Sequence, residues 1–563
     1  MASASDYYDL GSYHCPVSTA SKDAQILFDR GLIWSYAFNH EEAVECFEKA
    51  IASDPACAMA YWGLAYSLGP NYNKPWEFFD DKELEKTVSR THDAAANAEV
   101  HAPASTPVEQ AIIRALQFRY PKESENKEYS IWNQAYADAM GLVYEKFPGD
   151  LDVAALYADA LMNLTPWQLW DLRNGQPAEG AQTLEAKHVL ERALAHDGGL
   201  SHPGLLHLYI HLMEMSSTPE IALPIASHLR GLVPDSGHLN HMPTHLDILC
   251  GDYQNAISSN SDAICADEKF LARSGPLNFY TLYRCHNYHF RIYAAMFSGQ
   301  SKVALDTVAQ LESSLSEDLL RIKSPPMADW LEGFLSVRVH VLIRFGLWEG
   351  IVNLELPHDQ ELYCVTTSMM HYAKAIAFAA TGKVEEAEKE RDFFHQALKR
   401  VPNSRMLFNN TCVDILAIAS AMIDGELEYR KRNFDLAFGH LRRSITLDDE
   451  LPYDEPWGWM QPTRHAYGAL LLEQGRVEDA AAVYKADLGL DDTLPRVLQH
   501  RNNVWALHGY HECLVKLRRT SDAQKTGEKL AMAIQIADVP VRSSCFCRLT
   551  AAKDTEIMEY CKN

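Results

Sequence analysis

The chain has 563 residues, which exceeds the size at which one globular core stops growing, so several domains or one long repeat array are required. Hydrophobic residues make up 47% of the sequence and charged residues 23%, a composition that excludes a disordered chain. The formal net charge of −25 argues against a nucleic acid or an anionic membrane as partner, because most of this surface would repel either.

The N-terminal sequence M-A-S-A-S-D-Y-Y-D-L has neither the basic start nor the apolar stretch of a secretory signal. No apolar run approaches the roughly 20 residues that a membrane span needs. The twelve cysteines are scattered without C-x-x-C pairs or a disulfide-like spacing, which fits reduced thiols in a cytosol. The sequence therefore predicts a cytoplasmic protein.

Internal repeats begin near the N-terminus. Residues 24–57 match the 34-residue tetratricopeptide pattern, in which small residues let two antiparallel helices approach and a proline ends the second. The matching residues are Gly31, Ala43, Phe47, Ala50 and Pro55. A second unit begins near Ala58, and residues 130–163 again have the pattern of a helix pair. These matches predict consecutive helical hairpins.

Later repeats can be placed by counting back from the small residue at position 20 of each unit. Ala222 places one repeat start at Pro203, and Ala256 places the next at Gly237, 34 residues on. A third start, at Cys285, follows an insertion around 258–276. Further helix pairs are expected from about Met327, Ser368, Ile418, Gln461 and Asn502, and no stretch shows convincing strand alternation.

The predicted fold is all-α: a tetratricopeptide-like superhelix of helix pairs, an α-solenoid closed around a concave cavity. We expect an N-terminal extension at 1–23, a single superhelix at 24–540 and a C-terminal tail at 541–563. The repeats at 203–297 are of special interest because nine of the 24 histidines fall between His202 and His289.

Most of these histidines recur at helical spacing. One set is i, i+4, i+7, the next i, i+3, i+7 and the last i, i+3, so each set shares one face of its helix. In the register above, all of them fall at positions that line the concave side of a tetratricopeptide superhelix. The predicted metal ligands are His207, His211, Glu214, His238, His241, His245, His286 and His289.

Neutral imidazole is the commonest transition-metal ligand, and an i, i+4 pair on a helix can chelate one ion. A nearly all-imidazole set suits copper first and zinc second, rather than magnesium or calcium. Eight candidates exceed one usual site, so two metals, or one metal with acid–base histidines, would use the surplus. A non-metal polar pocket that binds anions, or chance spacing, would also give this pattern.

Three residues are predicted to take part in catalysis. Glu214 is expected to be a ligand, an acceptor that fixes a histidine tautomer, or a general base. His371 belongs to an inner helix further along and is expected to face the same cavity. Tyr283 flanks the third histidine pair and would orient a substrate. The sequence has no Walker loop, no dinucleotide-binding glycine motif and no G-x-S-x-G elbow.

The segments Y-I-H-L-M-E-M-S, G-H-L-N-H-M-P-T-H and C-H-N-Y-H-F resemble a broad family of bacterial and fungal tetratricopeptide-repeat proteins. They have a more distant likeness to tetratricopeptide repeat protein 38. The resemblance covers most of the chain, including L-G-P-N-Y-N near Gly69 and M-M-H-Y-A-K near His371. It implies a compact tetratricopeptide superhelix. It supplies no activity or ligand, so the metal hypothesis depends on spacing alone.

Two classes of function follow. As an enzyme, the protein would use copper and dioxygen to oxidise a small aromatic or phenolic substrate, or zinc-bound water for hydrolysis or hydration. As an adaptor, it would bind a partner protein's peptide in its groove. The first repeat carries Phe28, Leu32 and Ser35 where the chaperone-tail clamp carries Lys and Asn, so that clamp is excluded. The enzyme hypothesis is preferred at this point.

Overall fold

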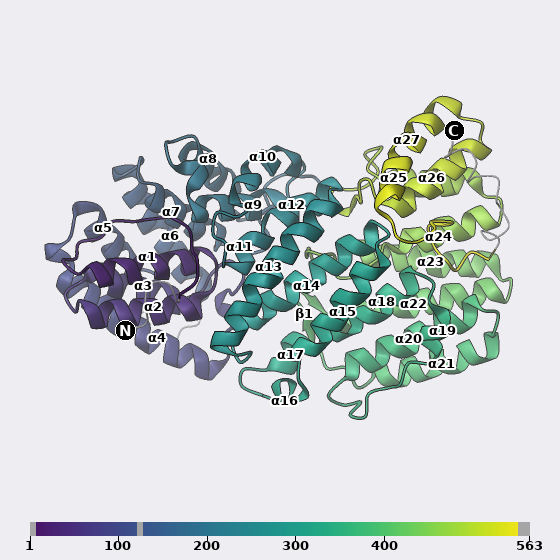
Figure 1. The fold of residues 1–563 in the computed structure, drawn as a ribbon, viewed down its shortest axis with the longest axis horizontal. Helices are drawn as coiled ribbons and strands as arrows, with labels where there is room; N and C mark the ends of the chain where they lie inside the picture. Colours follow the sequence, from purple (N-terminus) through teal and green to yellow (C-terminus); the bar gives the residue numbers. More distant parts are fainter. Residues whose placement is uncertain (1–6, 121–127, 550–563) are drawn as a thin grey trace. The chain divides into compact units, whose positions relative to one another are not determined.

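The computed structural model describes residues 7–120 and 128–549, which fall into two compact units. The first unit comprises Met1–Leu246 and Asp262–Arg284, and the second comprises Asp247–Ser261 and Cys285–Asn563. Within each unit, α-helices joined by short turns pack against the next helix along the chain, as Figure 1 shows. The predicted all-α architecture of tetratricopeptide-like helix pairs is confirmed.

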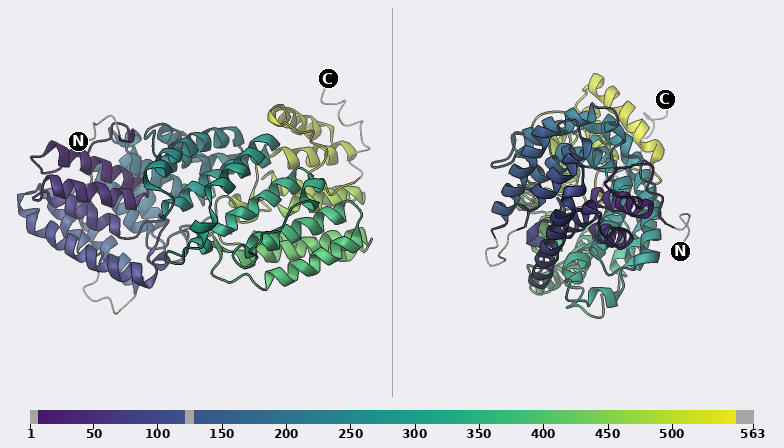
Figure 2. Two further views of the ribbon diagram at one scale, coloured as in Figure 1. Left: turned by 60° about the horizontal axis from the view of Figure 1, so that its bottom comes forward. Right: turned by 90° about the vertical axis from the view of Figure 1, so that its left-hand side faces the viewer.

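The first unit contains eleven α-helices of its own among the described residues. They are α1 (Lys22–Tyr36), α2 (His40–Ser53), α3 (Ala58–Leu68), α4 (Asp81–His101), α5 (Pro107–Leu116), α6 (Tyr129–Lys146), α7 (Leu151–Met162), α8 (Thr183–Leu194), α9 (Pro203–Glu214), α10 (Leu223–Ala226) and α11 (Gly237–His241). Short 3₁₀ turns join some of them: η2 (Trp76–Phe78), η3 (Ala102–Ala104), η4 (Gly199–Ser201), η5 (Pro219–Ala222) and η6 (Ser227–Leu229). The helices α1 to α4, purple in Figure 2, lie side by side.

The second unit continues the same construction. Its helices are α15 (Ser301–Ser314), α16 (Glu317–Leu320), α17 (Met327–Leu331), α18 (Val337–Arg344), α19 (Trp348–Val352), α20 (Cys364–Ala380), α21 (Val384–Leu398), α22 (Cys412–Arg430), α23 (Phe434–Asp449), α24 (Thr463–Glu473), α25 (Val477–Asp487), α26 (Val504–Lys516) and α27 (Thr520–Ile536), with 3₁₀ turns η7 (Glu332–Ser336) and η8 (Arg496–Leu498). The predicted pairs from Met327 onward are thus present. One feature was not predicted: a hairpin of two-residue strands, β1 (Met406–Leu407) and β2 (Asn410–Thr411), precedes α22.

Three helices contain residues of both units: α12 (Pro243–Cys250), α13 (Tyr253–Ser274) and α14 (Tyr280–Phe297). The insertion expected around 258–276 is not a loop, because it forms the second half of α13. That helix ends at Ser274, and the next residue, Gly275, has a φ of +70°, a left-handed conformation that ends helices readily. Pro276 follows and cannot continue the helix.

The histidine-bearing helices begin close to their predicted starts. Helix α9 begins at Pro203, which suits the first helical position because its missing N–H would have no partner there. The second histidine segment was predicted as one helix, and this was wrong in detail. It is divided into α11 and α12, because Pro243 lacks the N–H that would continue α11.

The first helix pair shows how the repeat pattern produces close packing. The ring of Phe47 in α2 is fully buried and lies against Gly31 in α1 and Gly63 in α3. A Cβ added at Gly31 would lie 2.7 Å from this ring, and one at Gly63 would lie 2.3 Å from it. Glycine at both positions therefore lets three consecutive helices meet on one phenyl ring.

No helix in the described ranges is long and apolar enough to cross a membrane. The cytoplasmic location stays a prediction. The division into an extension at 1–23, a superhelix at 24–540 and a tail at 541–563 also stays a prediction. Residues 1–6 of that extension and 550–563 of that tail lie outside the described residues.

We expect Gly63→Ala to lower the stability of the first unit by about 1–3 kcal/mol, because the added methyl group overlaps the buried Phe47 ring. The measurement is the midpoint of urea unfolding followed by circular dichroism. Gly149→Ala, in the turn between α6 and α7, is the matched control, because nothing lies within 4 Å of its added Cβ. Equal midpoints for the two variants would contradict the packing role of Gly63.

Candidate metal centre

Six of the eight predicted ligand residues come together in the first unit. They are carried by α9, α11 and the first turns of α12, and each is at most 1% exposed. The six are His207, His211, Glu214, His238, His241 and His245. A cluster of buried imidazoles at this density requires a specific arrangement of hydrogen bonds or a bound ion, because each ring carries a donor and an acceptor.

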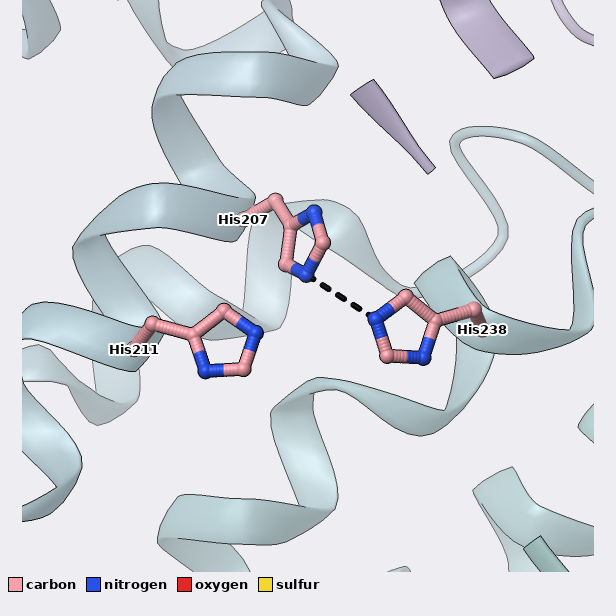
Figure 3. A group of neighbouring side chains, drawn as sticks. All are labelled: His207, His211 and His238. Atoms are coloured by element: carbon pink, nitrogen blue, oxygen red, sulfur yellow. Dashed lines mark hydrogen bonds between the residues drawn. The ribbon is translucent and has the colours of Figure 1, made fainter. Parts of the chain in front are cut away.

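Three of the rings converge. One ligand nitrogen from each of His207, His211 and His238 lies within 4.8 Å of the others. Figure 3 shows the three rings turned toward one another, with His207 Nε2 and His238 Nε2 3.1 Å apart. The Nε2 atom of His211 is fully buried and has no hydrogen-bond partner among the described residues. Three imidazoles are a donor set of the kind that zinc and copper bind.

The tautomer of His207 is fixed by the end of α1. Its Nδ1 lies 2.5 Å from the carbonyl oxygen of Tyr36, the last residue of that helix. A carbonyl only accepts, so Nδ1 carries the proton and Nε2 carries a lone pair. The Tyr36 carbonyl is also one of the groups that a helix leaves unpaired at its C-terminus. One hydrogen bond therefore completes α1 and directs the lone pair of His207 toward His238.

Glu214 fixes the tautomers of two further rings. Its Oε1 lies 3.0 Å from His211 Nδ1, and its Oε2 lies 2.6 Å from His245 Nδ1. Both imidazoles donate to the carboxylate, so His211 Nε2 is left as a lone pair for the converging set. His245 Nε2 lies 2.8 Å from His241 Nε2, which extends the chain by one more ring. Carboxylates in this position behind a ligating histidine orient the ring and raise its basicity.

Glu214, His211 and His245 also form a group with ligand-type atoms close together. Their atoms already bond to one another, however, because each Nδ1 donates to the carboxylate. His211 has one nitrogen for Glu214 and one for the converging set, so it cannot serve two ions at once. The two groups that share His211 therefore cannot both hold an ion.

Burial keeps the converging imidazoles neutral. Desolvation lowers the pKa of His207 well below its usual value, and the charge of His211 lowers it further. Desolvation likewise lowers the pKa of His211, with a smaller effect from His245. Neutral rings retain the lone pairs that a metal ion requires.

Aromatic side chains enclose the converging imidazoles. The ring of Phe38 lies 4.3 Å from that of His207, Tyr72 lies 5.0 Å from His211, and Tyr283 packs edge-on to His238 at 4.6 Å. Trp167 meets His211 edge-on at 5.7 Å. Of these four, sequence reasoning had selected only Tyr283 as a site residue. The others lie in turns far from α9 in sequence, where helical periodicity gives no signal.

The remaining predicted site residues belong to the second unit. His286 and His289 both lie against Phe408, with ring centres 4.6 Å and 6.4 Å apart. His371 Nδ1 lies 2.7 Å from Glu390 Oε2 on the neighbouring helix α21. Their roles as ligands or as a catalytic group stay predictions. The predicted closed concave cavity is not confirmed.

No family model matches the sequence, and no curated protein matches it. Among solved structures, the chain is similar to the crystal structure of the APC/C hetero-tetramer Cut9-Hcn1, at 12% identity and a TM-score of 0.29, with 96% of both chains covered. It is also similar to the crystal structure of yeast Tom70, at 12% identity and a TM-score of 0.28, with 92% of this chain and 93% of that chain covered. A third likeness, to the structure of Naa15/Naa10 bound to HypK-THB, has 12% identity and a TM-score of 0.20, with 96% and 75% covered.

Likenesses at these TM-scores carry no argument about function. The helical repeats implied by the sequence resemblance are established by the helix pairs themselves. Membership of the bacterial and fungal tetratricopeptide-repeat family, and the likeness to tetratricopeptide repeat protein 38, stay predictions.

We expect Glu214→Gln to destabilise the first unit by about 1–3 kcal/mol, because a neutral amide offers one acceptor oxygen where two imidazoles donate. Imidazole ¹⁵N chemical shifts would report the loss of a fixed tautomer at His211 or His245. The matched control is Glu390→Gln, whose carboxylate holds only His371 and is 17% exposed, so water can replace it. If both variants lower the midpoint of urea unfolding by the same amount from the wild-type value, Glu214 does not organise the cluster.

Proposed function

We propose that this chain is a non-catalytic helical-repeat scaffold that holds one transition-metal ion in its first unit and binds a protein partner. The observation that carries the metal assignment is the buried Nε2 atom of His211. It has no hydrogen-bond partner in the described parts of the chain and converges with the Nε2 atoms of His207 and His238. An unpaired polar atom at such a depth costs free energy, and a metal ion would satisfy it.

The donor set supports copper or zinc. Three neutral imidazoles are borderline-soft ligands, and magnesium or calcium would require carboxylate and carbonyl oxygens instead. The Nδ1 atom of His211 donates to the Glu214 carboxylate, and that of His207 donates to the Tyr36 carbonyl. Both rings are therefore held with the Nε2 lone pair free to bind an ion. Copper is the first expectation from the nearly all-imidazole composition, and zinc is the second.

Burial favours a scaffold over a catalyst. The three converging histidines are at most 1% exposed, and the rings of Phe38, Tyr72 and Tyr283 pack directly against them. Catalytic metal sites keep a coordination position open to substrate, whereas structural sites are closed by the protein. Arrays of helix pairs commonly bind partners through the extended surfaces that their stacked repeats create. The adaptor hypothesis therefore replaces the enzyme hypothesis as the preferred one.

A metal-dependent enzyme is the second candidate, and the hydrogen-bonded chain behind His211 is the observation that favours it. Glu214, His245 and His241 form a continuous path along which a proton could move. Bound copper would supply oxidation of a small aromatic or phenolic molecule, and bound zinc would supply an activated water. In either case Glu214 acts as a positioning residue, because both its oxygens hold imidazoles.

Metal analysis tests the proposed site. We expect untagged wild-type protein to contain about one copper or zinc ion per chain, measured by inductively coupled plasma mass spectrometry. His238→Gln should lose this ion, because it removes one of three ligands. His228→Gln, at an exposed histidine outside the cluster, should retain it. Two results together would exclude the site: wild-type protein that contains no metal after anaerobic reloading, and a melting temperature that a chelator does not change.

Turnover assays separate the two candidate functions. We expect metal-loaded wild-type protein to oxidise catechol and to hydrolyse 4-nitrophenyl acetate no faster than His238→Gln, because the enclosed site leaves no room for substrate. A partner identified by cross-linking in native extract should then bind when both purified proteins are mixed. Turnover that requires both the metal and His238 would instead establish the enzyme.

A further inference from the structure

A cavity lies in the first unit, beside the imidazole cluster. It has a volume of about 320 Å³ and is bordered by the turn before α2, the first turn of α2, the segment after α3, and α4. Phe279, which precedes α14, and Tyr280, its first residue, complete the wall of the cavity. This size suits a small organic molecule.

The amide of Asn39 gives the cavity an unsatisfied donor. Asn39 lines the cavity and is 1% exposed, and its Oδ1 caps α2 by accepting from the backbone N–H of Glu42 at 3.3 Å. This bond fixes the orientation of the amide, so the other end is the NH₂ group. Nδ2 has no hydrogen-bond partner among the described residues. An acceptor atom on an occupant of the cavity would satisfy this donor.

The charges around the cavity point to an anion. Lys74, Lys86 and Arg90 line it, against the carboxylates of Glu41 and Glu83. Glu83 pairs with Lys74, and Glu41 Oε1 accepts from a backbone N–H at 3.2 Å. Arg90 pairs with Glu48 at 2.6 Å, which leaves Lys86 as the lining cation that no carboxylate pairs with among the described residues. The first turn of α2 also borders the cavity, and helix N-termini favour negative charge.

Aromatic rings form much of the remaining wall. Lys74 Nζ lies 4.2 Å from the ring centre of Phe79 and 4.9 Å from that of Phe279, which holds the ammonium group between two phenyl rings. Phe38 and Tyr280 add further aromatic surface. A ligand that fills this space needs a flat apolar body as well as a negatively charged group.

We propose that this cavity binds a small organic anion, with a carboxylate or phosphate group on an aromatic body. The anionic group accepts from Asn39 Nδ2 and lies near Lys74, while the body packs against the aromatic wall. The site does not depend on a metal, although Phe38 borders both the cavity and His207. Its occupant is therefore separated from the imidazole cluster by one aromatic ring.

Isothermal titration of metal-free protein tests this proposal with benzoate, phenyl phosphate and benzylammonium as probes. We expect the wild type to bind at least one of the two anions about tenfold more tightly than the cation. The better of the two identifies the carboxylate or phosphate source. Failure of both anions to bind, or a preference for benzylammonium, would overturn the proposal whatever the metal content of the protein.

Asn39→Asp is the informative variant. Aspartate is as good an N-cap as asparagine, so α2 keeps its cap while the donor becomes a negative charge. We expect anion binding to weaken about tenfold or more. Asn97→Asp adds the same charge at an exposed position of α4 and should leave binding unchanged. Lys74→Gln should weaken binding as well and serves if Asn39→Asp does not fold. If Asn39→Asp or Lys74→Gln folds and still binds the anion as tightly as the wild type, the proposed site is contradicted.

Discussion

The Glu214 carboxylate, held between two imidazoles, is the interaction on which the buried cluster depends. A carboxylate with no exposure to water is costly unless its oxygens accept strong hydrogen bonds. His211 on the same helix and His245 on α12 provide them, at 3.0 Å and 2.6 Å. Because each ring must donate through Nδ1, its Nε2 lone pair points elsewhere. The tautomer that metal binding would require of His211 therefore follows from the need to bury one charge.

The helical repeat provides the second constraint. Helix α9 places His207 and His211 on one face, one turn apart, and the end of α1 supplies the carbonyl that orients His207. This carbonyl has no partner inside its own helix, so the bond satisfies both groups. The close approach of neighbouring helices in this unit depends on small residues, as Gly31 and Gly63 show around Phe47. The packing of α9 near the end of α1 thus also sets the orientation of the His207 ring.

Much of the fold and the main part of the site could be predicted from local sequence patterns. The repeat register placed the start of α9 at Pro203, and helical spacing selected the six residues that come together in the first unit. Pro243 was visible, but its effect on the second histidine helix was not anticipated. The division between units also could not be predicted, because it falls inside continuous helices such as α14.

Other parts of the site depend on contacts between distant segments, which leave no periodic signal. The acceptor for His207 is a backbone carbonyl, so the identity of Tyr36 does not reveal it. Phe38 and Tyr72 reach the cluster from turns near the N-terminus. The unpaired amide of Asn39 gives no signal in the sequence, because asparagine is an ordinary residue at the N-cap of a helix.

The last residue of α1 and the turn that leads to α2 combine these requirements in residues 36–39. Tyr36 orients His207, Phe38 covers the imidazole cluster, and Asn39 caps α2 while its amide lines the neighbouring cavity. Phe38 has a φ of +56°, a left-handed conformation that is unfavourable for a bulky side chain. Such strain persists where surrounding contacts over-determine the backbone, and it is frequent at functional sites. This turn contacts both sites, so it is where an ion at the histidines and a ligand in the cavity could influence each other's binding. Linkage requires that such coupling be reciprocal: the ion would change the affinity for the ligand by the same factor as the ligand changes the affinity for the ion.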